Sequence, residues 1–198
     1  SAAEALGLKW YDSVDALIAD PEVDAVYVAT NNATHAEIAI KAMEAGKHVF
    51  LEKPITLSAE EAIDLFERSE KPGAPLFFPQ QNRRFEAVFM DLMKTIESGK
   101  LGNVFEVTIS ERGYQRRDDW QTISEFGGGQ LFNWGPHIVD HALRFIGGEP
   151  KEIFSYLDHV AAGGDCDDHI KILFEGENDR IIDMEISGGC ALPLPEYM

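Results

Sequence analysis

The chain has 198 residues, of which 44% are hydrophobic and 26% charged, and its formal net charge is −18. An acidic surface repels phosphate backbones, which argues against nucleic-acid binding, although a local pocket can still take an anionic ligand. No apolar run approaches the roughly 18 residues of a membrane span, so no membrane partner is expected. Two cysteines make no disulfide framework and no signal peptide precedes them, so we expect a cytoplasmic protein.

Helix and strand signals alternate in residues 1–83. The expected order is helix 14–18, strand 24–30, helix 33–45, strand 47–52, helix 58–70 and strand 76–80. The first two strands are short apolar runs, which is typical of strands buried on both faces. Ser58 and Glu61 predict a capping box at the start of their helix. This order predicts parallel βαβ units, with a ligand crevice beyond the carboxyl ends of the strands.

Three polar clusters follow the three predicted strands. They are Thr30–Asn31–Asn32, Glu52–Lys53–Pro54 and Gln81–Asn82–Arg83–Arg84. Because parallel strands end at the same edge of a sheet, these clusters predict a site there without reference to any family. Desolvation at such a place favours the neutral amine, so Lys53 can exchange a proton with a substrate. The alternative is a surface lysine that follows an edge strand.

The second half of the sequence has a different pattern. Its expected elements are helix 86–98, strand 103–111, helix 137–146 and strands 152–160, 169–174 and 180–187. Consecutive strand signals joined by turn residues predict an open antiparallel sheet, so this half is expected to have an α+β fold. We place the domain boundary at residue 83, which gives domains of residues 1–83 and 84–198.

Several other groups of residues carry weaker signals. His137 and His141 have the spacing of two metal ligands on a helix, but Ile138 stands where the zinc-protease motif has glutamate, so no metal site is expected. Residues 165–169 include ligand types, yet neighbours on a loop point in different directions, which predicts a solvated acidic turn. Gly127–Gly129 lacks the spacing of a phosphate loop and predicts close backbone packing near a ligand.

Three segments together resemble the Gfo/Idh/MocA family of nicotinamide-dependent oxidoreductases. They are Ala29–His35, Ala45–Pro54 and Gly127–Asp140. Their order and spacing match from about residue 7 to about residue 187, and the AGKHVFLEKP segment is highly specific. The resemblance implies an incomplete Rossmann-type parallel sheet in residues 1–83. It also implies a substrate and oligomerisation domain in residues 84–198.

The resemblance implies hydride transfer between NAD or NADP and a hydroxyl carbon of a sugar or polyol. Lys53 matches the family's catalytic lysine and His137 its acid/base histidine. Asn133 stands where the family often has aspartate, and an amide can position a substrate but cannot act as a base. The residues implied at the cofactor crevice are Thr30, Asn31, Asn32, His35, Glu52, Lys53, Pro54, Asn82 and Arg83. The expected substrate-binding residues are Arg112, Trp120, Trp134 and Asp140.

The glycine-rich pyrophosphate turn of a Rossmann domain does not occur in the sequence. We therefore expect a fragment of a longer dehydrogenase, truncated at both ends, that is inactive by itself. A homo-oligomer formed through the antiparallel sheet is also expected. Two alternatives remain open. One is a metal-dependent sugar isomerase or lyase that uses His137 and His141, and the other is a non-catalytic carbohydrate-binding module.

Overall fold

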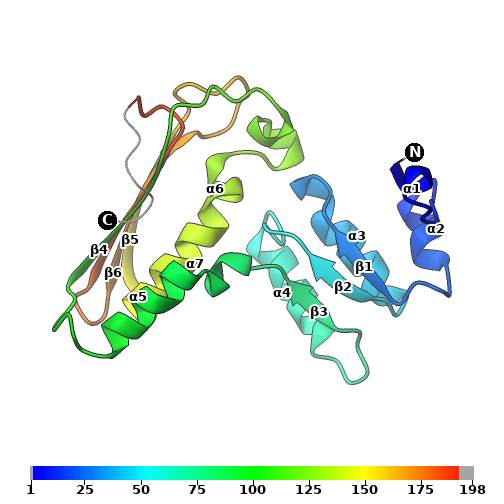
Figure 1. The fold of residues 1–198 in the computed structure, drawn as a ribbon, viewed down its shortest axis with the longest axis horizontal. Helices are drawn as coiled ribbons and strands as arrows, with labels where there is room; N and C mark the ends of the chain where they lie inside the picture. The colour runs from blue at the N-terminus through cyan, green and yellow to red at the C-terminus, as the bar shows by residue number, and fades with distance from the viewer. Residues whose placement is uncertain (1, 192–198) are drawn as a thin grey trace. The chain divides into compact units, whose positions relative to one another are not determined.

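A computed structural model describes residues 2–191 of the chain (Figure 1). The chain forms two compact units, Ser1–Gln80 and Gln81–Met198. The division therefore lies between Gln80 and Gln81, shortly before the boundary expected after residue 83. Within the described residues, no helix is long and apolar enough to span a membrane.

The first unit is built around a parallel sheet with the strand order β1-β2-β3. In chain order its elements are α1 (Ala2–Ala5), α2 (Val14–Ala19), β1 (Ala25–Val28), η1 (Asn32–Thr34), α3 (His35–Glu44), β2 (His48–Leu51), α4 (Ala59–Ser69) and β3 (Phe77–Pro79). Ala25 pairs with His48, and Phe50 pairs with Phe78. Parallel neighbours need a crossover, which α3 and α4 supply, so the expected βαβ units are confirmed.

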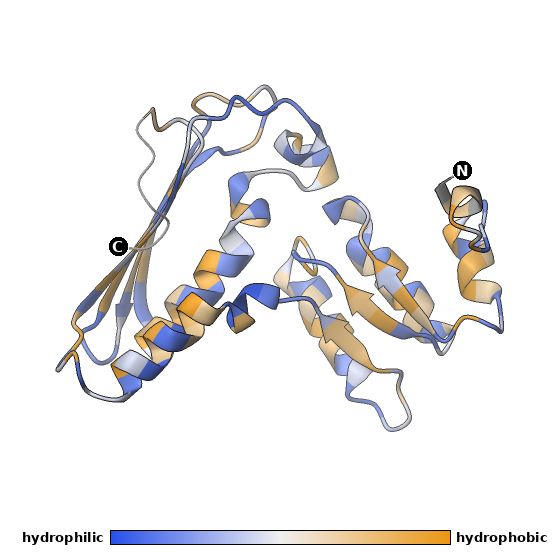
Figure 2. Ribbon diagram, viewed as in Figure 1, coloured by the Kyte–Doolittle hydropathy of each residue, from blue (hydrophilic) through white to orange (hydrophobic). Residues whose placement is uncertain are grey.

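Only one face of this sheet is buried. Val26 and Val28 of β1 are buried together with Val49 and Leu51 of β2, in a core that α3 packs against. On the other face Tyr27, Phe50 and Phe78 stay exposed. The expectation of strands buried on both faces is therefore wrong. Aromatic residues made the runs uniformly hydrophobic (Figure 2), and hydropathy alone does not separate one buried face from two.

The second unit is built around a four-stranded sheet with the order β4-β7-β6-β5. Its elements are η2 (Asn82–Phe85), α5 (Ala87–Glu97), β4 (Glu106–Arg112), η3 (Trp120–Thr122), η4 (Ser124–Phe126), α6 (Gln130–Asn133), α7 (Gly135–Ile146), β5 (Pro150–Asp158), β6 (His169–Gly176) and β7 (Ile181–Ser187). Strands β5, β6 and β7 are antiparallel, as expected. Strand β4 runs parallel to β7, so the sheet is mixed rather than fully antiparallel.

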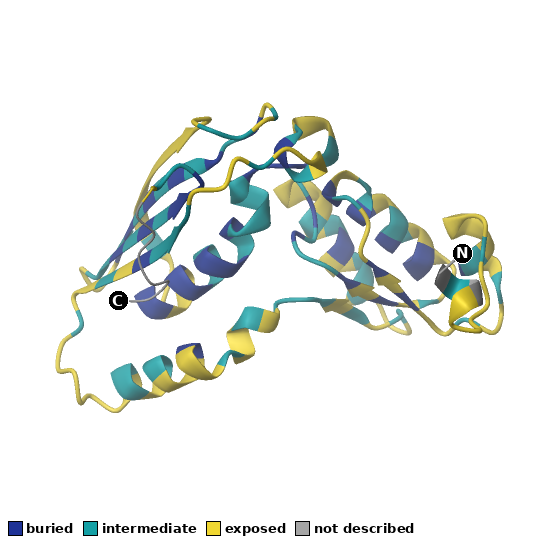
Figure 3. Cartoon of the chain, turned by 45° about the horizontal axis from the view of Figure 1, so that its top comes forward, coloured by how far each residue is buried: buried dark blue, intermediate teal, exposed yellow. Residues whose placement is uncertain are grey.

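Helix α7 covers one face of this mixed sheet (Figure 3). Its buried residues Ile138, Ala142 and Phe145 share a core with residues of the strands such as Ile182 and Met184. The buried positions of β6 and β7 alternate with half-buried ones, so the opposite face of the sheet remains open. The architecture is thus a Rossmann-like parallel sheet followed by an α+β unit.

Candidate functional site

In the first unit, the carboxyl ends of the strands lie side by side. The Glu52 N–H donates to the Val28 carbonyl at 3.0 Å, and the Gln80 N–H donates to Leu51 at 2.8 Å. These bonds bring the ends of β1, β2 and β3 to one edge of the sheet. The Lys53–Pro54 peptide bond at this edge is cis. Lys53 is half-buried and Pro54 is buried.

Hydrogen bonds within the segment brace the loop that follows β1. The Thr30 and Thr34 hydroxyls are 2.7 Å apart, and the Thr34 hydroxyl also donates to the Asn31 carbonyl at 2.9 Å. Asn32, the first residue of η1, is buried. The Asn31 Oδ1 atom is buried yet accepts no hydrogen bond from the described residues. Leaving a buried acceptor unsatisfied costs about 1–3 kcal/mol. This atom therefore fits a donor from outside the chain, such as a cofactor hydroxyl.

His35 links the two loops at this edge. Its Nδ1 lies 2.7 Å from the Pro54 carbonyl oxygen, and its Nε2 lies 3.2 Å from the Thr30 carbonyl oxygen. The ring is only 1% exposed. The sequence placed His35 among the residues that line the cofactor crevice, but the ring presents almost no surface to a ligand.

The Glu52 side chain is bound by a residue of β1 and by the turn that follows β2. Its carboxylate accepts hydrogen bonds from the Tyr27 hydroxyl and, at 3.2 Å, from the backbone N–H of Lys53. The bond to this carboxylate raises the pKa of Tyr27. Tyr27 was not predicted from the sequence. A tyrosine within an apolar strand is a signal for it, because its hydroxyl needs a hydrogen-bond partner.

In the second unit, the candidate residues gather at the start of α7. Asn133 ends α6, and His137 lies in the first turn of α7 and is buried. The Trp134 ring lies 6.3 Å from the His137 ring, and the Arg83 guanidinium stacks over Trp134 at 4.3 Å. The Gln81 side chain donates to the Pro136 carbonyl at 2.6 Å, which fixes η2 against this helix start. Arg83, Trp134 and His137 are thus neighbours, and Asn133 precedes Trp134 in the chain, while Asn82 is exposed at the start of η2.

Other expected substrate-binding residues have partners within the protein. Asp140 pairs with Arg84 at 2.6 Å and with Arg144 at 3.3 Å. Burial by itself would raise the pKa of Asp140, but the Arg84 guanidinium outweighs it and the pKa is lowered. Arg112 pairs with Glu185 across the sheet. Such pairs favour a structural role for Asp140 and Arg112. Trp120 begins η3 and is partly exposed.

His141 is a packed core residue. Its ring stacks on Phe89 with centroids 3.9 Å apart, and its Nε2 lies 3.2 Å from the Arg83 carbonyl. Burial lowers the pKa of His141, so the neutral ring is favoured. Among residues 2–191, no three or more His, Cys, Asp and Glu side chains are grouped so that they could hold a metal ion.

The acidic segment 165–169 is not the solvated turn that the sequence predicted. The Asp168 carboxylate is buried and accepts three backbone N–H bonds, and Asp165 accepts the N–H and the hydroxyl of Ser124. Asp167 accepts the Leu131 N–H at 2.9 Å. A Cβ on Gly129 would lie 2.5 Å from this Asp167 carboxylate, so the close packing near Gly129 is against the protein itself. The donors to Asp165 and Asp167 lie 41 and 36 residues away in the chain, which local patterns do not reveal.

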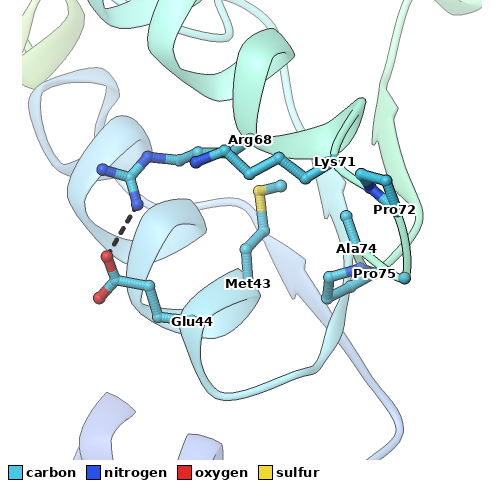
Figure 4. A pocket seen from close by; sticks show the side chains of 8 residues that line it. Met43, Glu44, Arg68, Lys71, Pro72, Ala74 and Pro75 are labelled. Atoms are coloured by element: carbon cyan, nitrogen blue, oxygen red, sulfur yellow. Dashed lines mark hydrogen bonds and ion pairs between the residues drawn. The ribbon is translucent and has the colours of Figure 1, made fainter.

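Two hollows lie away from these residues. One, of about 260 Å³, lies between the C-terminal ends of α3 and α4 and is lined by Met43, Glu44 and Arg68, among others (Figure 4). Another, of about 700 Å³, is apolar and lies between α5 and β4. None of the predicted site residues lines either hollow.

Comparison with known proteins assigns the fold to a family. Residues 1–79 match the profile described as "Oxidoreductase family, NAD-binding Rossmann fold", and residues 89–197 match the "GFO/IDH/MocA C-terminal domain". The chain belongs to the GFO/IDH/MocA oxidoreductase family. The resemblance drawn from the three sequence segments is therefore confirmed, as is the Rossmann-like domain followed by an α+β domain.

Relatives of known sequence and structure agree with this family. Myo-inositol 2-dehydrogenase of Thermotoga maritima is 33% identical over 86% of this chain and 52% of its own length. The crystal structure of an NAD-binding protein from Listeria innocua is 32% identical, with a TM-score of 0.92 over 99% of this chain and 58% of that one. GenD2 from gentamicin A biosynthesis, solved in complex with NAD, is 26% identical with a TM-score of 0.84, over 96% of this chain and 55% of its own. The chain spans about half the length of the curated relatives it matches, from 38% to 54%.

Proposed function

We propose that the protein carrying this chain is an NAD- or NADP-dependent oxidoreductase that acts on a hydroxyl carbon of a sugar or polyol. The observation that carries the proposal is the braced Glu52–Lys53–Pro54 turn at the carboxyl edge of the parallel sheet, beside the unsatisfied Asn31 acceptor. The name of the Thermotoga relative, myo-inositol 2-dehydrogenase, supports a polyol substrate. The proposed location is the cytoplasm, which is consistent with the free cysteines Cys166 and Cys190.

In this proposal the chain's own residues handle the proton and orient the substrate. When bound, the nicotinamide group supplies the hydride acceptor. Lys53 donates a hydrogen bond to the substrate hydroxyl oxygen and stabilises negative charge that develops there. His137 accepts the hydroxyl proton as the carbonyl forms and returns it in the reverse direction. Asn133 orients the substrate through its amide because it has no carboxylate to take a proton.

The cofactor would be held at the edge described above. Asn31 offers its acceptor to a cofactor hydroxyl, and the loop that contains Thr30 and Asn32 forms one wall of the crevice. The packing of His141 on Phe89 weighs against the alternative of a metal-dependent isomerase that uses both histidines. Sugar binding with no nicotinamide requirement would favour the alternative of a non-catalytic module.

The test is Lys53→Met in the full-length protein, assayed with NAD and NADP against a panel of polyols. Acid/base groups contribute about 10²- to 10⁴-fold to a rate, so turnover should fall by that factor while cofactor binding is retained. Lys71→Met is the matched control, because Lys71 lies in the loop after α4, at the other end of the helix from this edge. Unchanged turnover in Lys53→Met would reject the assignment.

A further inference from the structure

We propose that His35 is a positioning residue that fixes the backbone of Lys53 relative to the loop after β1. This inference rests on the proposed function, in which Lys53 acts on the substrate oxygen. The side chain of His35 spans from the first turn of α3 to the residue that follows Lys53. Its role would be to hold two strand ends in register rather than to touch the cofactor.

The position of the ring is set by its surroundings. His35 begins α3, whose residues Ala36 and Ala39 are buried in the first unit, so the helix cannot turn without disturbing that packing. The ring itself is 1% exposed. Its two nitrogens lie at 2.7 Å and 3.2 Å from the carbonyl oxygens of Pro54 and Thr30. The ring therefore links the backbone after β2 to the start of α3, which directly follows the loop after β1.

Lys53 is consequently held on both sides. The residue before it, Glu52, is bound to β1 through the Tyr27 hydroxyl and the Val28 carbonyl. The residue after it, Pro54, is bound through His35. Without the ring, the turn loses its tie through Pro54 and keeps the one through Glu52. A displacement of about 1 Å in a reacting group can cost about 10²-fold in rate, so this second tie matters for the reaction.

The two ring contacts are chemically unequal. Both ring nitrogens face carbonyl oxygens, and a neutral imidazole can donate to only one of them, so we assign the donor to Nδ1, whose contact with Pro54 is the shorter. An asparagine amide nitrogen occupies about the place of Nδ1, and a glutamine amide nitrogen about the place of Nε2. His35→Asn therefore keeps the hydrogen bond to Pro54, whereas His35→Gln loses that bond and places its donor toward the Thr30 carbonyl. This pair separates the two contacts with substitutions of similar polarity.

The experiment compares His35→Asn, His35→Gln and His35→Phe in the full-length protein. We measure kcat, the Kd of the reduced cofactor by nicotinamide fluorescence, and Tm. The expected result is a fall in kcat of about 10- to 100-fold in His35→Phe and His35→Gln, with most of the rate retained in His35→Asn and cofactor Kd within about threefold. His48→Phe is the matched control, because His48 begins β2 at the end of the strand away from Lys53 and accepts the Leu76 N–H.

Two results would overturn the inference. A weakened cofactor Kd with unchanged kcat would mean that the ring contacts the cofactor. Equal kcat in all folded variants would mean that the ring only stabilises the fold. A double-mutant cycle with Lys53 distinguishes these two results from a failure of the proposed function. In the Lys53→Met background, His35→Phe should cause no further loss of the residual rate, because its effect acts through Lys53. If Lys53→Met alone leaves turnover intact, the proposed function itself fails.

Discussion

Asp168 is a buried carboxylate that is stabilised by backbone donors rather than by a cation. It is 3% exposed and accepts the N–H groups of Val160, Ala161 and Ala162 at 2.6–2.8 Å. Burial by itself would raise the pKa of Asp168, but the three donors outweigh it and the pKa is lowered below its usual range. The carboxylate therefore fixes the turn between β5 and β6.

Replacing this carboxylate tests its contribution to stability. Because the folded pKa lies below the unfolded value of about 3.9, the stabilisation is complete above that value and is lost as the pH falls through the folded pKa. Asp168→Asn should lower the free energy of unfolding at pH 7 by about 1.5–3 kcal/mol and flatten its dependence on pH below 4. Urea unfolding at several pH values measures both effects. The exposed Glu177→Gln is the control, and equal pH profiles for Asp168→Asn and the parent would contradict the argument.

A sequence motif predicts some of the candidate residues. Residues whose partners are distant in the chain cannot be predicted in this way. Lys53 was predicted from its position after a strand and from the AGKHVFLEKP segment. The same segment contains Lys47, whose ammonium donates to the carbonyls of Asp20 and Val23 at 2.8 and 2.7 Å. The local pattern places Lys47 at the start of the strand and Lys53 after its end, but it does not reveal what Lys47 binds. The role of Lys47 depends on chain segments more than twenty residues apart, which only the fold brings together.

Helix α4 begins where its capping residues predict. The Ser58 hydroxyl accepts the Glu61 N–H at 3.2 Å, while the Glu61 carboxylate accepts the N–H of Leu57 at 3.3 Å. Ser58→Ala should therefore cost about 1 kcal/mol in the free energy of unfolding. Ser69→Ala is the same substitution at the other end of the helix, where the hydroxyl only donates to Phe66, and should change stability by less than about 0.5 kcal/mol. Chemical unfolding of both variants gives the comparison, and equal losses would argue against the cap.

The direction of β4 in its sheet could not be predicted from the sequence. Alternation in residues 103–111 predicted a strand, and β4 forms there. Its neighbour is β7, which is distant in the chain and runs parallel to it, with Glu106 opposite Ile181. Turn residues fix the direction of strands that follow one another, as for β6 and β7. Strand β4 is separated from its partner by helices, so no turn signal could fix its direction.

At the scale of the whole molecule, each unit has its own core and its own exposed sheet face. The core of the first unit contains Leu51 and Leu65, and the core of the second contains Phe145 and Met184, with no residue in common. The sequence pattern predicted two domains, and the structure has two separate cores. The exposed faces of the two sheets could not be predicted in the same way. Hydropathy identifies apolar residues, but it does not show whether the same chain or a partner covers them.

The open face of the mixed sheet is where we expect copies of the protein to associate. Phe154 and Tyr156 of β5 point to that face, beside Leu173 and Lys171 of β6, and the two aromatic rings are at least half exposed. Aromatic residues at the centre of an interface commonly contribute 2 kcal/mol or more, about 30-fold in Kd. We therefore expect Phe154→Lys to weaken self-association by about this factor, measured by light scattering across a concentration series.

The neighbouring residue provides the control for this prediction. Ile153 is similarly exposed on the same strand, but it lies opposite Phe174 and so belongs to the face that carries the core. Ile153→Lys introduces the same charge and the same loss of apolar surface on the wrong side of the sheet. Dissociation by Phe154→Lys alone would locate association on the open face. Equal effects of both variants, or none from either, would mean that the copies do not meet through this sheet.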